Sequence, residues 1–201
     1  MLFYWKALET SERLWWVLFG VSIGLGALSK YSIFLIYIPL ALFSWKYHRD
    51  ILKSRSVYLS IFIALLIFSP VIYWNIKQKG VGLFHLIHLT GVNDHKHSGW
   101  EVLSNILEFV SGQILIVLPF YEYRTIYRKF KQNSLTKEEE FLILPAFCMF
   151  SIFLMVSIIR RSGVYINWAM FAYTGLPILF SHYTLNGNNL KLNRLVAIPK
   201  A

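Results

Sequence analysis

The sequence predicts an all-α protein, a polytopic bundle of transmembrane helices. Two observations lead to this class. Hydrophobic residues make up 56% of the 201 residues and charged residues only 15%, whereas a soluble domain carries roughly a quarter charged residues. Apolar stretches of spanning or near-spanning length also recur along the whole chain. Both observations indicate a protein whose solvent is largely lipid.

We expect one transmembrane domain, 1–201, with about six spans at 14–29, 31–45, 57–75, 103–121, 141–159 and 164–183. The last four each cover most of a ~30 Å hydrocarbon core. The first two are shorter, and we expect two helices that meet at Lys30. Gly20 and Gly24 form a G-x-x-x-G pattern, which permits close approach of a neighbouring helix. The glutamates at 138–140 favour a helix N-terminus.

The basic residues predict the orientation. Fourteen of the 20 lysines and arginines precede residue 14 or follow the segments 31–45, 103–121 and 164–183. The positive-inside rule places these fourteen in the cytoplasm. The opposite side then carries the turn at Lys30, an extracytoplasmic loop at 76–102 and a short turn at 160–164. The net charge of +10 fits contact with anionic lipid headgroups better than it fits nucleic acid binding.

Three cations on the outer side are suited to a phosphate or pyrophosphate. Arg160 and Arg161 can contact phosphate oxygens in pairs, and Lys30 supplies a point charge. Snorkelling of Lys30 and interfacial anchoring by the two arginines explain the same residues without a ligand. The sequence leaves both readings open.

Carboxylates on the outer side are candidates for a general base. Glu108 lies within a predicted span, where acidic residues are often functional, although it is near the interface. Asp94 and Glu101 belong to the outer loop region. None of the three has a sequence partner that marks it as a base.

The loop 76–102 also raises the question of a metal site. Imidazoles and a carboxylate can bind zinc, but their spacing here matches no strong signature, and a solvated loop is the simpler interpretation. The histidines concerned are His85, His88, His95 and His97. Asn167, Trp168 and Tyr173 open the last segment on the outer side, where they fit either an aromatic belt or contacts with a sugar.

Four short motifs occur in order along the chain: GLGALSKY at 24–31, SPVIYWN at 69–75, EFVSGQ at 108–113 and NWAMFAY at 167–173. Together they resemble the bacterial branch of the dolichyl-phosphate-mannose-protein mannosyltransferase family, glycosyltransferase family 39. The aminoarabinose transferases of lipid A modification belong to the same group. The resemblance extends from Leu14 to about Tyr183.

The resemblance implies a C-type glycosyltransferase fold in a bacterial inner (plasma) membrane. It implies a polyprenyl-phosphate-linked sugar donor and a protein, lipid or glycan acceptor on the outer side. Lys30, with Arg160 or Arg161, would contact the donor phosphate, and the loop 76–102 would cover the cavity. Tyr31 and the residues 167, 168 and 173 would contact substrate. The resemblance assigns no metal-binding residue here, and a divalent ion is compatible with it.

The chain departs from the family where the catalytic acid should be. The family's Asp-Glu motif in the first outward loop is absent, so we expect a middle-to-C-terminal fragment without its N-terminal catalytic portion. The catalytic residue is therefore unknown, with Asp94 as a weak substitute. The alternatives are a transporter or flippase for an anionic lipid or solute, and a non-catalytic membrane subunit.

Overall fold

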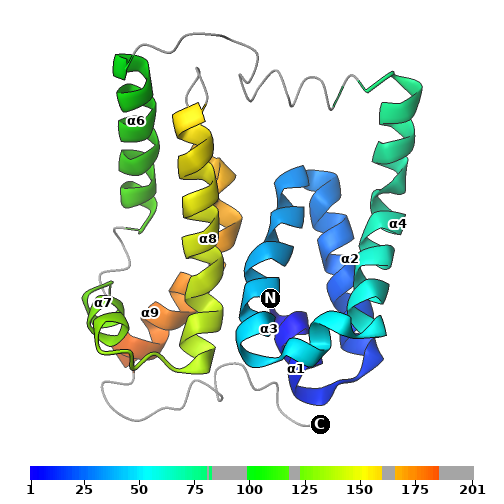
Figure 1. Ribbon diagram of the computed structural model, residues 1–201, viewed down its shortest axis with the longest axis horizontal. Helices are drawn as coiled ribbons and strands as arrows, with labels where there is room; N and C mark the ends of the chain where they lie inside the picture. Colours follow the sequence, from blue (N-terminus) through cyan, green and yellow to red (C-terminus); the bar gives the residue numbers. More distant parts are fainter. Residues whose placement is uncertain (81, 83–98, 118–122, 160–165, 186–201) are drawn as a thin grey trace. The chain divides into compact units, whose positions relative to one another are not determined.

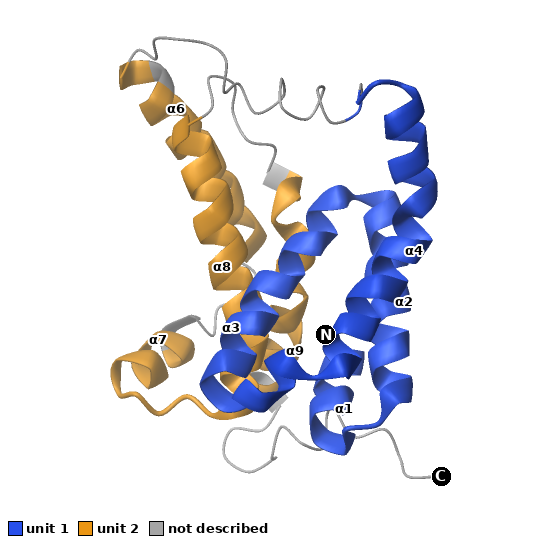
Figure 2. Cartoon of the chain, turned by 45° about the vertical axis from the view of Figure 1, so that its right-hand side comes forward, with its two compact units in different colours: residues 1–88 blue, residues 89–201 orange. Residues whose placement is uncertain are grey.

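The structure, a computed structural model, describes residues 1–80, 82, 99–117, 123–159 and 166–185 (Figure 1). Within these ranges the regular secondary structure is helical, without strands. The prediction of an all-α fold is therefore confirmed for this part of the chain. The chain divides into two compact units, residues 1–88 and residues 89–201 (Figure 2).

The first unit is an up-and-down arrangement of helices. α2 and α4 run in the same direction, and α3 runs in the opposite one (Figures 1 and 2). The junction at Lys30 and the C-terminal end of α4 therefore lie at one end of the unit, and the turn before α4 lies at the other. The elements in order are α1 (Leu2–Thr10), α2 (Arg13–Ser29), η1 (Tyr31–Ile36), α3 (Tyr37–Tyr47), η2 (Arg49–Lys53) and α4 (Arg55–Lys77).

A close approach between α2 and α4 organises this unit. Gly20 and Gly24 are buried in α2. A Cβ atom at position 20 would lie 2.5 Å from the carbonyl oxygen of Ser60, and one at position 24 would lie 2.8 Å from Cβ of Ile67. The predicted close contact at the G-x-x-x-G pattern is therefore present, and α4 is the neighbouring helix.

Aromatic side chains from three helices fill the core beside this contact. Phe19 is only 1% exposed, and its ring centroid lies 5.1 Å from that of Tyr4 and 5.5 Å from that of Tyr37. The Tyr4 hydroxyl donates to the carbonyl oxygen of Leu40 at 3.2 Å and pairs with Ser44 Oγ at 2.5 Å. The core thus buries a phenol without leaving it unsatisfied, as burial requires.

The segment that begins at Tyr31 starts as a 3-10 helix, and α-helical structure begins only at Tyr37. Pro39 is compatible with this boundary, because it has no N–H to donate to the carbonyl of Leu35 and its ring crowds that carbonyl. Proline is tolerated in the first turn of a helix, and Pro39 lies in the first turn of α3.

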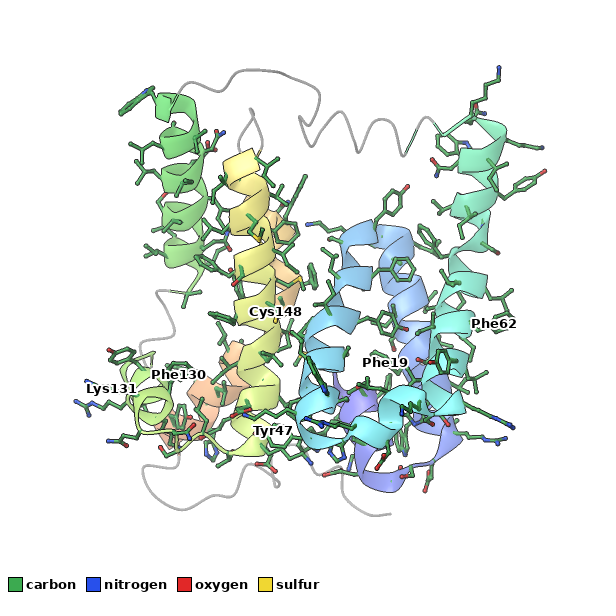
Figure 3. All side chains as sticks on the ribbon, viewed as in Figure 1. Phe19, Tyr47, Phe62, Phe130, Lys131 and Cys148 are labelled. Carbon is green, nitrogen blue, oxygen red and sulfur yellow. The ribbon has the colours of Figure 1, made fainter. Side chains whose placement is uncertain are left out.

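Large apolar side chains are exposed along α4. The exposed fractions are 62% for Phe62, 60% for Leu66 and 73% for Ile76 (Phe62 is labelled in Figure 3). α4 and a helix of the second unit, α8 (Lys137–Ile159), are both long and apolar enough to cross a membrane. A water-exposed helix seldom presents such a surface, so the distribution favours hydrocarbon around α4.

The second unit is built around α8. α8 packs against α6, η4 and α9, and α7 lies crosswise near the start of α8 (Figures 1 and 2). Ser157 of α8 donates to the carbonyl oxygen of Asn105 of α6 at 3.0 Å. The elements are α6 (Gly99–Val117), α7 (Tyr123–Lys131), α8 (Lys137–Ile159), η3 (Ile166–Trp168), η4 (Met170–Thr174) and α9 (Gly175–Leu185).

A reciprocal cap begins α8. The N–H of Glu139 donates to Thr136 Oγ1 at 3.3 Å, and the N–H of Thr136 donates to Glu139 Oε2 at 2.9 Å. Glu139 Oε1 also accepts from Lys129 Nζ at 2.6 Å and from the Tyr183 hydroxyl at 2.7 Å. One carboxylate, 2% exposed, therefore joins α7, α8 and α9.

The Glu139 carboxyl lies ahead of the apolar stretch 141–159 and stays ionised. Burial raises its pKa, but hydrogen bonds from Lys129, Thr136 and Tyr183 outweigh burial, so the pKa lies below its ordinary value. The predicted helix N-terminus at 138–140 is present, since these residues form part of the first turn of α8.

Candidate functional site

Lys30 lies where α2 ends. Its backbone is extended, with φ −153° and ψ 116°, so the α-helix cannot continue through it. Its N–H donates to the carbonyl oxygen of Gly26 at 2.9 Å, and its own carbonyl accepts from the N–H of Ile33 at 3.0 Å. The junction is therefore a defined corner. Burial lowers the pKa of the Lys30 ammonium, which is the effect expected of a cation held beside apolar helices.

A cavity of about 440 Å³ opens beside this corner. Its walls are aromatic and aliphatic, apart from one amide and one ammonium. The rings of Tyr31 and Phe34 both contact that of Phe68 edge-on, with centroids 5.4 and 5.2 Å apart. The lining residues are Tyr31, Phe34, Phe68, Val71, Ile72, Asn75, Ile76, Lys79 and Gly80.

Asn75 supplies the amide. It is 8% exposed, and its Nδ2 donates to the carbonyl oxygen of Val71 at 2.9 Å. Its Oδ1 is buried and has no hydrogen-bond partner among the described residues. Leaving a buried acceptor unsatisfied costs about 1–3 kcal/mol.

A turn after α4 closes the cavity. The N–H of Gly80 donates to the carbonyl oxygen of Asn75 at 2.7 Å, and both Lys79 and Gly80 have positive φ, 52° and 81°. A Cβ atom at Gly82 would lie 2.5 Å from Asn75 Oδ1. The chain therefore turns back over the amide, and Lys79 lies at the wall of the cavity rather than beyond it.

The second unit contains a separate cavity of about 560 Å³. Tyr173 is 7% exposed and donates from its hydroxyl to Gln113 Oε1 at 2.6 Å. This pair supplies almost all of the polarity in an otherwise apolar wall. The lining residues are Gln113, Ile114, Val117, Ile143, Ala146, Phe147, Phe150, Tyr173 and Leu176. Such a surface suits an apolar chain more than a sugar.

The other residues expected at the start of the last segment are placed differently. Asn167 and Trp168 belong to η3, a turn ahead of Tyr173. Asn167 is exposed, whereas Trp168 is half-buried and packs edge-on against Phe153, with ring centroids 5.8 Å apart. Neither residue lines the apolar cavity of this unit.

The remaining predicted site residues lie outside the described residues. They are Asp94, Arg160 and Arg161, and the loop histidines His85, His88, His95 and His97 lie there too. Lys30 and Tyr31 belong to the first unit. Asn167, Trp168 and Tyr173 belong to the second. Across the described ranges, His, Cys, Asp and Glu form no group of three that could hold a metal ion.

Asn75 and Gln113 received no role from the sequence, although both lie in the quoted motifs. Each is an amide inside an apolar helix, 8% and 2% exposed respectively. That contrast is the signal by which sequence reasoning could have found them, because an amide in a span must be satisfied inside the protein. The hydrogen-bond partner of each amide depends on the tertiary structure and does not follow from the sequence pattern.

The corner at Lys30 and five of the nine residues that line the first cavity lie in the segment that matches a known family. Residues 1–74 match the model of the dolichyl-phosphate-mannose-protein mannosyltransferase family. The resemblance inferred from the motifs is confirmed over these 74 of the 201 residues. No curated protein and no solved structure matches the chain. The match includes Lys30 and Tyr31 and ends one residue before Asn75.

Proposed function

We propose that the chain contributes the donor-binding part of a mannosyltransferase-like membrane glycosyltransferase, which uses a polyprenyl-phosphate sugar donor on the outer side of a bacterial plasma membrane. The observation that carries this proposal is the family match over the segment that contains Lys30. The acceptor would be a protein, a lipid or a glycan. The membrane location is supported by the exposed apolar surface of α4 and by the length and composition of α4 and α8.

Lys30 is the residue we assign to the donor phosphate. In the transfer, an acceptor hydroxyl oxygen attacks the anomeric carbon and the bond from that carbon to the phosphate oxygen breaks. The bonding electrons leave with the lipid phosphate, and the acceptor proton passes to a carboxylate. A fixed cation lowers the barrier because negative charge grows on the departing phosphate. Arg160 or Arg161 would add a second contact of the same kind.

The cavity beside Lys30 supports a binding site for the polar end of the donor. Tyr31 and Phe68 offer aromatic edges, and the Asn75 side chain adds an amide to the same wall. Asn167 and Trp168 are proposed as further substrate contacts. The apolar cavity at Tyr173 and Gln113 suits the isoprenoid chain of a lipid. We assign no catalytic base among the described residues.

Binding of a short polyprenyl phosphate to the purified full chain tests the assignment of Lys30. A charge-assisted contact to phosphate contributes about 1.5–3 kcal/mol, so Lys30→Gln should weaken binding roughly 10-fold or more. Lys46→Gln is the matched control, because Lys46 lies in the last turn of α3, at the far end of that helix. Equal affinity for wild type and Lys30→Gln would remove Lys30 from the site.

The side of the membrane can be tested independently. A reporter enzyme that is active only outside the cytoplasm should be active when it is fused at residue 90. A cytoplasmic location would put Lys30 opposite the proposed donor and overturn the proposal. Movement of the lipid across vesicles without sugar transfer would support a flippase instead.

A further inference from the structure

α7 is a short helix with two chemically different edges. Its sequence YRTIYRKFK places aromatic residues at positions 123, 127 and 130 and basic residues at 124, 128 and 131. At 3.6 residues per turn, each set of three falls on one side of the helix, and the two sides are adjacent. We call them the aromatic edge (123, 127, 130) and the basic edge (124, 128, 131).

Side chains on both edges are exposed. Tyr127 is 65% and Phe130 is 71% exposed, and Arg128 and Lys131 are exposed as well (Phe130 and Lys131 are labelled in Figure 3). Ile126 and Lys129, which lie away from both edges, are only half-exposed. Packing therefore occupies one side of α7 and leaves four side chains of the two edges without cover from the described residues of this unit: Tyr127, Arg128, Phe130 and Lys131.

The orientation of α7 is fixed by its contacts. Lys129 Nζ lies 2.6 Å from Glu139 Oε1 and 5.1 Å from the ring centroid of Tyr183. Glu139 is in the first turn of α8, so α7 is held beside the end of a helix long enough to cross a membrane. α7 lies crosswise to α8 (Figure 1). If α8 crosses the bilayer, α7 lies along its surface.

We propose that α7 is an interfacial binding site for anionic phospholipids. The basic edge contacts lipid phosphates, while Tyr127 and Phe130 enter the boundary between headgroups and acyl chains. Amphipathic helices with aromatic residues on one side and Lys or Arg on the other bind membranes in this way. The proposal depends on α8 crossing the membrane and is independent of any sugar transfer.

Charge and geometry favour a lipid over a free anion. A pocket for a free phosphate needs converging donors, whereas Arg128 and Lys131 lie on an open helix surface. The exposed aromatic rings would gain nothing from a soluble anion but would gain hydrophobic burial in a bilayer. The Lys129 ammonium is committed to Glu139, so it holds the helix rather than the ligand.

Photocrosslinking of the full chain in nanodiscs tests the site directly. The probes are phosphatidylglycerol and phosphatidylcholine that carry the same acyl-chain diazirine, and yields are read on the peptide containing residues 123–131. We expect a higher yield with phosphatidylglycerol. Arg128→Gln with Lys131→Gln should weaken this preference about 30-fold, or ~2 kcal/mol for two basic residues. Arg128→Lys with Lys131→Arg keeps both charges and should retain it.

Other arms of the experiment separate the alternatives. Tyr127→Ser with Phe130→Ser should reduce crosslinking by both lipids, because the aromatic edge would no longer enter the bilayer. Equal yields for the two probes, or an unchanged preference in the double glutamine variant, would overturn the proposal. Displacement of phosphatidylglycerol by millimolar inorganic phosphate at constant ionic strength would indicate a free-anion site and would also overturn it. Thermal unfolding in detergent identifies any variant whose loss comes from misfolding.

Discussion

Gly20→Ala tests whether the close approach of α2 and α4 holds the first unit together. The added Cβ would lie 2.5 Å from the carbonyl oxygen of Ser60 and 3.0 Å from its Cα. Both atoms belong to the backbone of α4, so no side-chain rotation relieves the clash. The two helices must separate, or the residue must distort.

The size of the effect follows from two opposing terms. Alanine is favoured over glycine inside a helix by about 1 kcal/mol. Overpacking of a close contact costs about 1–3 kcal/mol, and the backbone clash at Gly20 puts it at the upper end. The net expected loss is about 1–2 kcal/mol of the free energy of unfolding. Ser60 is fully buried, which leaves little room to relax.

Thermal unfolding of the purified chain in detergent, followed by circular dichroism at 222 nm, measures this loss. Gly20→Ala should lower Tm by a few degrees. Gly99→Ala is the matched control, because no atom lies within 4 Å of a Cβ built there, and its Tm should be unchanged or slightly higher. A Gly20→Ala Tm equal to or above that of wild type would refute the packing argument.

Four further outcomes are expected. Lys129→Met leaves Glu139 buried without its cation and should lower the free energy of chemical unfolding by about 2 kcal/mol. This is less than the roughly 3–5 kcal/mol lost when a fully buried pair is broken, because the Lys129 side chain is 32% exposed. The folded-state pKa of Glu139 is lowered, so its stabilisation is present above the ordinary carboxyl pKa and is lost as pH falls through the folded-state pKa. The difference in unfolding free energy between wild type and Glu139→Gln should therefore shrink as pH falls below about 4.5, and a constant difference would contradict the argument. Asn75→Leu removes an unpartnered acceptor, so it should leave Tm near wild type yet weaken binding of a sugar-bearing polyprenyl phosphate, and equal binding would exclude Asn75 from the site. Tyr173→Phe removes the hydrogen bond to Gln113 Oε1 and should lower the free energy of unfolding by about 0.5–1.5 kcal/mol, whereas an unchanged Tm would contradict a stabilising role for this bond.

Local sequence features predicted much of the helical framework. The spacing of Gly20 and Gly24 is a property of one helix face, so a close neighbour could be expected without knowing which helix it is. The glutamates at 138–140 similarly predict a helix N-terminus, because a cap involves residues three apart.

Tertiary partners were not predictable in the same way. The sequence predicts an interfacial aromatic residue at Tyr173, but the structure buries it. Its hydroxyl donates a hydrogen bond to Gln113, sixty residues earlier. The sequence places Asn75 at the end of a predicted span. Only the turn at Gly80, which the structure shows, encloses its amide. Neither contact follows from periodicity, because each depends on how separate segments meet.

The partners of Glu139 come from very different distances along the chain. Thr136 is three residues away and Lys129 is ten, whereas Tyr183 is forty-four residues further on. During synthesis the first two are made before the carboxylate and the last long after it. Lys129 is therefore available to neutralise the Glu139 carboxylate as soon as α8 forms. The hydrogen bond from Tyr183 is added only after α9 has been made, and it joins that last helix to the existing ion pair.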